Sequence, residues 1–306
     1  MKVMVIGATT PLGAAIVDHL LARRDTDLVL AVGRERESHE PARDRLVYRA
    51  ADLTHARAVH DLVWSAAREH AIDVVVHVAQ HRDTRAVGSS IRAQNVTAAT
   101  ELVRACREHR TIRRLVYRSF ADVYAVRSDT AELVNEDAPL DFDPHAPAWL
   151  RNRVEADLAV CSQRGGPLAI AVLRCAEIFA ADSGSSLWNA LSARVCLRPL
   201  GFDPMVNLLS IADAASAFGA ALASDATGVF NIPGADTLPL SRTFEESVRV
   251  AIPVPRAAIP RARRLRAPAL LDGSRARREL GYAPHTAIAW PMPWWRQLLD
   301  QLGAMR

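Results

Sequence analysis

The stretch Lys2-Val-Met-Val-Ile6-Gly7-Ala-Thr-Thr-Pro-Leu-Gly13 decides the fold of this chain. A short apolar run is followed by a glycine-spaced turn and by the helical periodicity of residues 14–21, which predicts a strand, a tight turn and a helix. Gly7 permits the bend after the strand, and Gly13 lets the helix pack closely on it. The helix N-terminus then presents free N–H groups and the positive end of its dipole. This arrangement predicts a site for the pyrophosphate of a dinucleotide, although Thr10 stands where the usual fingerprint has its middle glycine.

The same alternation of strand and helix continues through the first half of the chain. Continuous Val, Leu and Ile runs joined by helices predict a parallel sheet that is covered on both faces and binds ligands at the carboxyl ends of its strands. The predicted fold class is α/β, a Rossmann-type doubly wound parallel sheet with a smaller C-terminal substrate lobe. The predicted strands are residues 2–6, 28–32, 46–49, 74–78, 115–118 and 168–173, and the predicted helices are residues 11–23, 55–70, 88–109 and 148–163.

The rhythm changes after Arg174, where prolines such as Pro199 and Pro233 divide the chain into short pieces. We therefore predict a dinucleotide-binding region over residues 1–174, which includes the active-site loop and helix. The remaining residues, 175–306, are expected to form a smaller substrate-binding lobe that is interleaved with this region and ends in a helix.

Two segments of the second lobe have unusual compositions. Residues 256–266 hold five arginines, which indicates either a solvated surface loop or a site for an anionic ligand or a membrane surface. Residues 290–299 hold three tryptophans, which indicates either a helix that covers the edge of the core or an anchor on a membrane surface. The sequence leaves both alternatives open.

The composition is that of an ordinary globular chain, with 306 residues, half of them apolar, and a net charge of +4. Arginines that are scattered and interleaved with acids disfavour a dedicated nucleic-acid binder. No apolar run is long enough to span a membrane, so no membrane span is expected. The cysteines have no metal-like spacing, so we predict no metal site and expect reduced core residues of a cytoplasmic protein at Cys106, Cys161, Cys175 and Cys196.

Later motifs follow one another in an order that is typical of one enzyme family. Ala51-Asp-Leu53 follows the third predicted strand, His77-Val-Ala-Gln80 closes the fourth, and residues 115–124 hold the fifth and its active-site end. With the opening turn, this order resembles the extended short-chain dehydrogenase/reductases, the NAD-dependent epimerase/dehydratase family. Further segments that resemble landmarks of the family are residues 95–96, 134–140, 173–174, 210–215, 227–232 and 279–282.

The resemblance implies a nicotinamide dinucleotide cofactor and a polar small-molecule substrate or ligand such as a nucleotide sugar. It also implies a homodimer formed through the helices of residues 88–109 and 148–163. The cofactor site that the opening turn and the resemblance imply consists of Gly7, Thr9, Thr10, Pro11, Leu12, Gly13, Gly33, Arg34, Asp52, Leu53, Val78, Ala79, Gln80 and Arg153.

The end of the second predicted strand indicates which dinucleotide is bound. An acidic residue there hydrogen-bonds the ribose hydroxyls and repels a 2′-phosphate, whereas a nearby guanidinium pairs with that phosphate. In this chain Gly33 occupies the acidic position and Arg34 follows it. We therefore expect NADP(H) in preference to NAD(H), and the alternative is that Arg34 is a solvated loop residue.

The proton relay of the family is missing from the sequence. The family reaction uses a tyrosine that exchanges a proton with the substrate and a lysine four residues later on the same helix face, whose ammonium lowers the tyrosine pKa from about 10. Trp149 and Arg153 stand at these positions, and Phe120 replaces the serine or threonine of the third position. An indole N–H has no comparable proton to give, and a guanidinium is no tunable base. Lys2 is the only lysine of the chain, so no Tyr-x-x-x-Lys pair exists in any register.

Two functions of different kinds therefore remain open. In the first, the chain is catalytically altered or silent and binds a dinucleotide as a sensor or partner subunit. In the second, it is an active NADP-dependent oxidoreductase, epimerase or dehydratase that uses a nonstandard acid or base. The candidates for that role are Asp122 and Tyr124, with Ser119 beside them, and the alternative is that all three only maintain an inherited loop.

Overall fold

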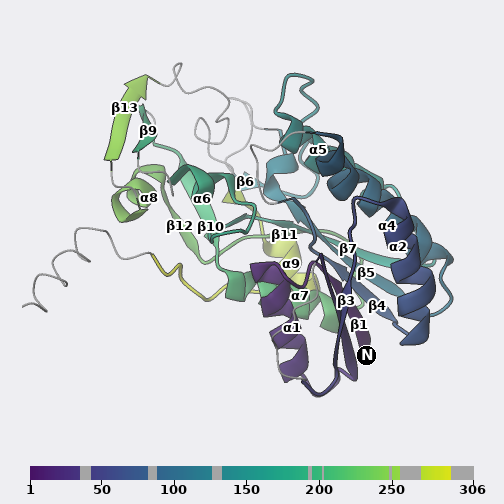
Figure 1. Ribbon diagram of the computed structural model, residues 1–306. Helices are drawn as coiled ribbons and strands as arrows, with labels where there is room; N and C mark the ends of the chain where they lie inside the picture. Colours follow the sequence, from purple (N-terminus) through teal and green to yellow (C-terminus); the bar gives the residue numbers. More distant parts are fainter. Residues whose placement is uncertain are drawn as a thin grey trace, which may run out of the picture.

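The computed structural model describes residues 1–34, 43–81, 88–125, 133–191, 195–201, 203–247, 250–255 and 270–290. Its central sheet consists of β1 (Lys2–Ile6), β2 (Leu28–Gly33), β3 (Leu46–Ala50), β4 (Val74–His77), β5 (Arg114–Phe120), β7 (Ala169–Cys175) and β11 (Gly228–Ile232). All neighbouring strands are parallel, in the order β11-β7-β5-β4-β1-β2-β3 (Figure 1). This sheet confirms the predicted doubly wound, Rossmann-type α/β fold.

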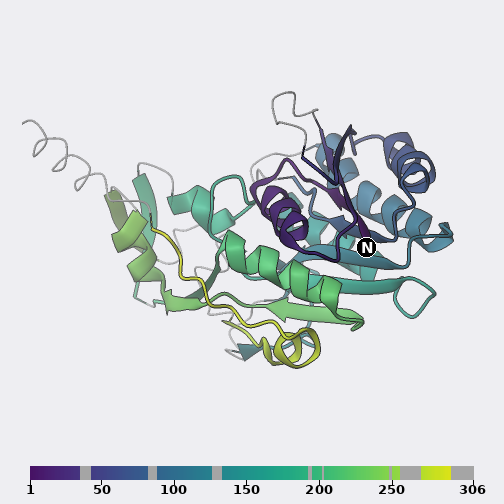
Figure 2. The same cartoon turned by 90° about the horizontal axis from the view of Figure 1, so that it is seen from below.

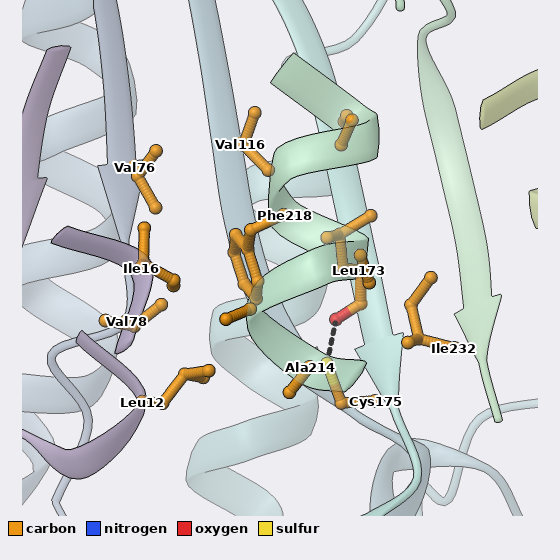
Figure 3. Close-up of a cluster of buried hydrophobic side chains, with 14 of the residues drawn as sticks. Leu12, Ile16, Val76, Val78, Val116, Leu173, Cys175, Ala214, Phe218 and Ile232 are labelled. Carbon is orange, nitrogen blue, oxygen red and sulfur yellow. Dashed lines mark hydrogen bonds between the residues drawn. The ribbon is translucent and has the colours of Figure 1, made fainter. Parts of the chain in front are cut away.

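Helices cover both faces of the sheet, and each layer is held by its own apolar core. One face carries α1 (Pro11–Ala22), α7 (Ile211–Ala223) and α9 (Ser274–Leu280). In this layer Ile16 and Phe218 lie against Val116 and Leu173 of the sheet (Figure 3). The other face carries α2 (Ala56–Asp61), η1 (Leu62–Ala67), α3 (Ser89–Arg92), η2 (Ala93–Thr97), α4 (Ala98–Glu108) and α5 (Ala148–Cys161).

A smaller group of elements follows β7 and extends to one side of the sheet (Figures 1 and 2). It contains a three-stranded sheet in the order β12-β10-β8 and a parallel pair of strands, β13 and β9. The apolar side chains of this group, among them Phe179, Leu208 and Phe244, form a core of their own. Its elements are β8 (Glu177–Ile178), α6 (Ser186–Leu191), β9 (Val195–Leu200), β10 (Met205–Leu209), β12 (Asp236–Pro239), α8 (Leu240–Ser247) and β13 (Val250–Pro255).

The second half of the chain also completes the central sheet. Strand β11 pairs with β7 at the sheet edge, and α7 packs beside α1 (Figure 2). The remaining short elements lie near these strands: η3 (Ala121–Val123) directly follows β5, and β6 (Leu133–Val134) pairs with β14 (Leu270–Leu271). The two regions are thus interleaved in the chain, whereas the boundary at residue 174 stays a prediction.

Most predicted elements lie within a few residues of the observed bounds, but two helices differ in kind. The predicted helix 55–70 is α2 followed by the π-helical η1, and the predicted helix 88–109 contains the π-helical η2. Periodicity does not distinguish these wider turns from an α-helix. No described helix is both long and apolar enough to cross a membrane. Residues 256–266 and 291–299 lie outside the described residues, whereas Trp290 packs on Phe179 with 5.1 Å between ring centroids.

Candidate functional site

Two positions at the turn between β1 and α1, Gly7 and Gly13, have room for glycine only. Gly7 has φ +98°, and a Cβ at this residue would lie 2.7 Å from the Ala79 backbone nitrogen. A Cβ on Gly13 would lie only 2.0 Å from the Gly7 carbonyl oxygen. The turn, the start of α1 and the end of β4 therefore lie backbone against backbone. This is the close approach that a phosphate-binding turn requires at a helix N-terminus.

Thr10 is part of this turn, and its side chain is used inside it. Its backbone is extended, with φ −84° and ψ 154°, so the missing middle glycine leaves no strain. Its hydroxyl donates a hydrogen bond to the Gly7 carbonyl oxygen at 2.8 Å and accepts one from the Gly13 nitrogen at 2.9 Å. Thr10 is thus the N-cap of α1. Pro11 follows at the first helical position, where its missing N–H costs no hydrogen bond.

The end of β2 has no room for the acidic residue that an NAD site usually carries. A Cβ on Gly33 would lie 2.3 Å from Cγ2 of Thr9, so any side chain at this position displaces Thr9. The next residue, Arg34, is exposed, and its Nη2 donates a hydrogen bond to Oε1 of Gln94 at 3.1 Å. A guanidinium is therefore the first charged group after β2.

Two other predicted cofactor residues follow β3. The Asp52 carboxylate accepts hydrogen bonds from the Thr54 backbone nitrogen at 3.0 Å and from its hydroxyl at 2.8 Å. These bonds, with a smaller contribution from Arg34, lower the pKa of Asp52. Leu53 is buried and belongs to the core under α2 and α4. Asp52 is therefore a carboxylate whose position after β3 is fixed by its bonds to Thr54.

The segment after β4 lines the middle of the predicted cofactor site. Val78 continues the strand and donates its N–H to the Ile6 carbonyl oxygen at 2.9 Å, and Ala79 contacts the glycine turn. The Gln80 side-chain nitrogen donates to the Tyr117 hydroxyl at 2.9 Å and to the Arg118 carbonyl oxygen at 3.0 Å. Its Oε1 is buried and has no hydrogen-bond partner among the described residues. Gln80 Oε1 is therefore available to accept a hydrogen bond from a bound group.

Ser119 and Asp122, at the carboxyl end of β5, each have a buried partner of their own. The Ser119 hydroxyl donates to the carboxylate of Asp157, a residue of α5. Asp122, in η3, forms a buried ion pair with Arg153 of α5. Both side chains therefore connect β5 to α5 in the structure, and their catalytic assignment stays a prediction.

Tyr124 lies in the core beneath this end of the sheet. Its hydroxyl donates a hydrogen bond to Oδ1 of Asn231 in β11 at 2.6 Å. Burial raises the pKa of Tyr124 to about 12. The phenol therefore stays protonated near neutral pH, and its proton is directed to a core residue. This geometry indicates a tyrosine that holds β11 against the active-site end, and a role in proton transfer stays a prediction.

Arg153 is the centre of a cluster with Phe120 and Trp149, the residues that are predicted at the positions of the family's relay. Its guanidinium carbon lies 3.6 Å from the centre of the Phe120 ring and 4.8 Å from that of Trp149. Besides pairing with Asp122, it donates a hydrogen bond to the Gly184 carbonyl oxygen at 2.8 Å. Arg153 thus packs on both Phe120 and Trp149, and the replacement of the family's serine, tyrosine and lysine by these three residues stays a prediction. They form a packed group with no hydroxyl or amine that donates a proton.

A second buried ion pair at this end was not found from the sequence. Nε and Nη2 of Arg174, in β7, donate to the two carboxylate oxygens of Asp157 at 3.0 and 2.7 Å. The pair lies beside Ser119, which bonds to the same carboxylate. A bidentate pair of this kind fixes α5 on the sheet. Only the spacing of Asp157 four residues after Arg153 could have placed it on the inner face of α5.

His77 and two of the four cysteines are buried in the core. His77 is fully buried and stacks on Tyr117 with ring centroids 5.4 Å apart, and burial lowers its pKa to about 4. All four cysteines are free, and Cys106 and Cys175 are buried as predicted, whereas Cys161 and Cys196 are only partly buried. Within the described residues, no group of three His, Cys, Asp or Glu side chains gathers to hold a metal ion.

Comparison with known proteins shows the family of this chain and gives several relatives, among them a reductase. The model of the NAD-dependent epimerase/dehydratase family matches residues 3–232. Over 325 aligned residues the chain is 32% identical to a 3-diazoavenalumate denitrifying reductase of a Streptomyces species, and the match covers 99% of both chains. This relative is therefore similar along its whole length.

Solved structures of low sequence identity share the fold. The UDP-glucose 4-epimerase of Thermus thermophilus in complex with NAD has a TM-score of 0.72 and 18% identity, over 94% of this chain and 95% of that one. The Bordetella bronchiseptica enzyme WbmH in complex with NAD⁺ also has a TM-score of 0.72, with 17% identity over 94% of each chain. Both bind a nicotinamide dinucleotide on the same fold as that described above.

Proposed function

The chain belongs to the NAD-dependent epimerase/dehydratase family, and from this premise we propose that it is an NADP(H)-dependent reductase whose reaction takes no proton from the protein. The observation that carries the proposal is the packed Phe120, Trp149 and Arg153 cluster beside an intact dinucleotide cradle. The glycine turn can bind a dinucleotide, which is the hydride donor. The cluster of Phe120, Trp149 and Arg153 contains no group that donates a proton to the substrate.

The residues present fit a dinucleotide. The turn of Gly7 and Gly13 holds the pyrophosphate at the N-terminus of α1, and Asp52 with Leu53 borders the adenine. Gln80 offers a buried acceptor, Oε1, to the inner part of the cofactor. Arg34 pairs with a 2′-phosphate, because the position before it is Gly33 and carries no acid to repel that group. NADP(H) is therefore the preferred cofactor.

When it is bound, the reduced cofactor supplies a hydride. A carbonyl substrate also needs a proton on its oxygen, which the tyrosine of other family members provides. At the matching positions this chain has an indole and a guanidinium that is held by Asp122, neither of which serves as a general acid. We therefore infer a substrate that is already electron-poor enough to accept a hydride alone.

An aromatic diazonium group meets this requirement, and the name of the full-length relative gives a diazo compound as its substrate. In the balanced reaction, R–N₂⁺ accepts one hydride, the C–N bond breaks, and R–H and N₂ are formed. The substrate is reduced by two electrons, the dinucleotide is oxidised by two, and no proton is consumed. The protein then needs only to bind the substrate, to orient it toward the dinucleotide and to exclude water. The apolar rings of Phe120 and Trp149 favour the exclusion of water.

The proposal is tested in two steps with the purified protein. Calorimetric titration is expected to give tighter binding of NADPH than of NADH. Mixing the protein and NADPH with 4-carboxybenzenediazonium is then expected to oxidise NADPH and release N₂ faster than the same mixture without protein. Oxidation at the background rate, with NADPH bound, would sink the reductase proposal and leave a binding protein.

The second candidate function is a catalytically silent, dinucleotide-binding protein. It is favoured by the same cluster, since the buried pair of Arg153 and Asp122 satisfies groups that a catalyst would leave available. It predicts NADPH binding without turnover of any substrate. Titration with UDP-glucose is the matching test for a nucleotide-sugar ligand, because solved structures of this fold contain that compound.

A homodimer through the helices of residues 88–109 and 148–163 remains part of the proposal, but their surface differs from an apolar interface. Arg92 of α3 and Glu155 of α5 form an exposed ion pair between these two segments, and Arg107 of α4 is hydrogen-bonded to Gln163. Leu158 is the one large apolar side chain with substantial exposure, 38%, on the described part of α5. The interface would therefore be polar, and sedimentation at several salt concentrations measures whether it forms.

A further inference from the structure

Arg118 is a buried cation that forms no ion pair with a carboxylate among the described residues. It lies near the carboxyl end of β5, only 5% of its surface is exposed, and its guanidinium carbon lies 4.5 Å from the centre of the Phe120 ring. Nη2 donates one hydrogen bond, to the Ser183 carbonyl oxygen at 2.8 Å. Nε is buried and has no partner among the described residues. A charge with one neutral partner is costly to bury.

Two of the other buried arginines of the described residues form ion pairs: Arg153 with Asp122 and Arg174 with Asp157. Arg114, at the opposite end of β5, forms no ion pair among the described residues, and its Nε is also buried without a partner there. Its Nη2, however, donates two hydrogen bonds, to the Ala221 carbonyl oxygen in the last turn of α7 and to the Ala226 carbonyl oxygen shortly after it, where the helix dipole is negative.

Arg118 has no such substitute for a carboxylate. Its acceptor, Ser183, precedes the N-terminus of α6 rather than following a helix C-terminus. The nearby carboxylate of Glu177 is directed elsewhere, since its Oε1 accepts hydrogen bonds from the Ser185 hydroxyl at 2.5 Å and the Leu187 nitrogen at 2.9 Å. Burial, with a smaller contribution from the Arg153 charge, lowers the pKa of Arg118 to about 10 although Glu177 partly opposes this shift, and the group is still charged near neutral pH.

We propose that Arg118 binds a carboxylate of the substrate, so that the substrate is an aromatic acid rather than a neutral compound. The unused Nε and the guanidinium plane provide the donors that a carboxylate accepts in a charge-assisted pair. The Phe120 ring, which contacts both Arg118 and Arg153, is the adjoining apolar surface. The inference rests on the proposed function in one respect, that the substrate binds at this end of the sheet.

The test is equilibrium binding of trans-cinnamate and of its neutral analogue trans-cinnamamide, measured by calorimetry with and without saturating NADPH. The wild-type protein is expected to bind cinnamate at least about tenfold more tightly than the amide, because a charge-assisted hydrogen bond is stronger than a neutral one. Arg118→Gln is expected to abolish this preference, and Arg118→Lys to keep part of it. Arg114→Gln, a buried arginine of the same strand, is the matched control and is expected to leave the preference unchanged.

A second measurement separates ligand binding from a structural role. Because Arg118 is uncompensated, Arg118→Met is expected to leave the Tm of the ligand-free protein unchanged or higher, whereas Arg114→Met lowers it. Equal binding of cinnamate and cinnamamide, or no binding of cinnamate at all, overturns the proposal, as does a fall in Tm for Arg118→Met that matches that of Arg114→Met. If the protein prefers cinnamate to cinnamamide but does not oxidise NADPH in the diazonium assay, only the proposed reaction is refuted. If it oxidises NADPH in that assay but binds cinnamate and cinnamamide equally, only the role of Arg118 is refuted.

Discussion

The two ends of the candidate site follow different constraints. At the β1–α1 turn the main chain packs closely on the main chain, and the Gly7 and Gly13 positions tolerate no side chain. At the β5–α5 end the contacts are between side chains, and Arg153 packs on Phe120 and Trp149. We propose that the cofactor site, which is fixed by the main chain, is kept while the side chains at the β5–α5 end support a different reaction. In the proposed function the chain binds a hydride donor, and its substrate accepts the hydride without a proton from the protein.

The largest expected effect is at the turn. Gly13→Ala places a Cβ 2.0 Å from the Gly7 carbonyl oxygen, so α1 must shift away from β1. We expect a loss of about 3 kcal/mol or more in stability, and NADPH affinity that falls at least about a hundredfold. Gly166→Ala is the control, because the Cβ would meet only the flexible end of the Arg107 side chain, at 3.2 Å. Unchanged NADPH affinity in Gly13→Ala would show that this turn does not hold the cofactor.

The next effect separates the two ends directly. Asp122→Asn leaves the Arg153 guanidinium buried without its carboxylate, which is expected to cost about 3–5 kcal/mol of unfolding free energy. Adding Arg153→Met to this variant is expected to recover most of the loss. Asp25→Asn, which breaks the exposed pair with Arg23, is the control and is expected to cost about 1 kcal/mol or less. Denaturant unfolding measures all four proteins, and equal losses for Asp122→Asn and Asp25→Asn contradict the account.

A third effect concerns acid stability at the end of β4, between the two regions. Burial lowers the pKa of His77 from 6.5 to about 4, so below pH 6.5 the unfolded chain binds a proton that the folded chain does not. Stability is therefore lost as the pH falls from 6.5 to about 4, by up to about 3 kcal/mol.

His77→Phe is expected to remove this loss while keeping the stacking on Tyr117, because neither ring nitrogen has a partner among the described residues. His145→Phe, at an exposed position, is the control and should leave the pH dependence unchanged. The measurement is denaturant unfolding at several pH values. If His77→Phe loses as much unfolding free energy below pH 6.5 as the wild-type protein, the loss comes from other groups.

The smallest effect tests the cofactor preference. Arg34→Glu replaces the guanidinium after β2 with a carboxylate that repels a 2′-phosphate, so NADPH affinity is expected to fall by about tenfold or more. NADH affinity is expected to stay the same or rise. Arg24→Glu changes the charge equally on a residue that precedes β2 and serves as the control. Calorimetric titration of both dinucleotides measures the difference, and equal losses for NADPH and NADH would remove the assignment of Arg34.

Local features of the molecule could be predicted from the sequence, and long-range pairings could not. The apolar run before Gly7 and the spacing to Gly13 indicated strand, turn and helix because these depend on neighbouring residues. The replacement of the relay by Trp149 and Arg153 stays a prediction from the sequence. The partners of the buried charges could not be predicted, because Asp122 and Asp157 reach Arg153 and Arg174 only after α5 has packed on the sheet. The lack of a counter-ion at Arg118 likewise depends on what folds around it.

The central claim, hydride transfer without a proton from the protein, is tested most directly by isotopic labelling. NADPH deuterated at its transferable position and 4-carboxybenzenediazonium are mixed with the protein in ordinary water, and the experiment is repeated with unlabelled NADPH in deuterium oxide. Direct hydride transfer gives benzoate that carries deuterium in the first experiment and none in the second, with no slowing in deuterium oxide. Deuterium taken from the solvent, or a rate limited by a solvent proton, would contradict it.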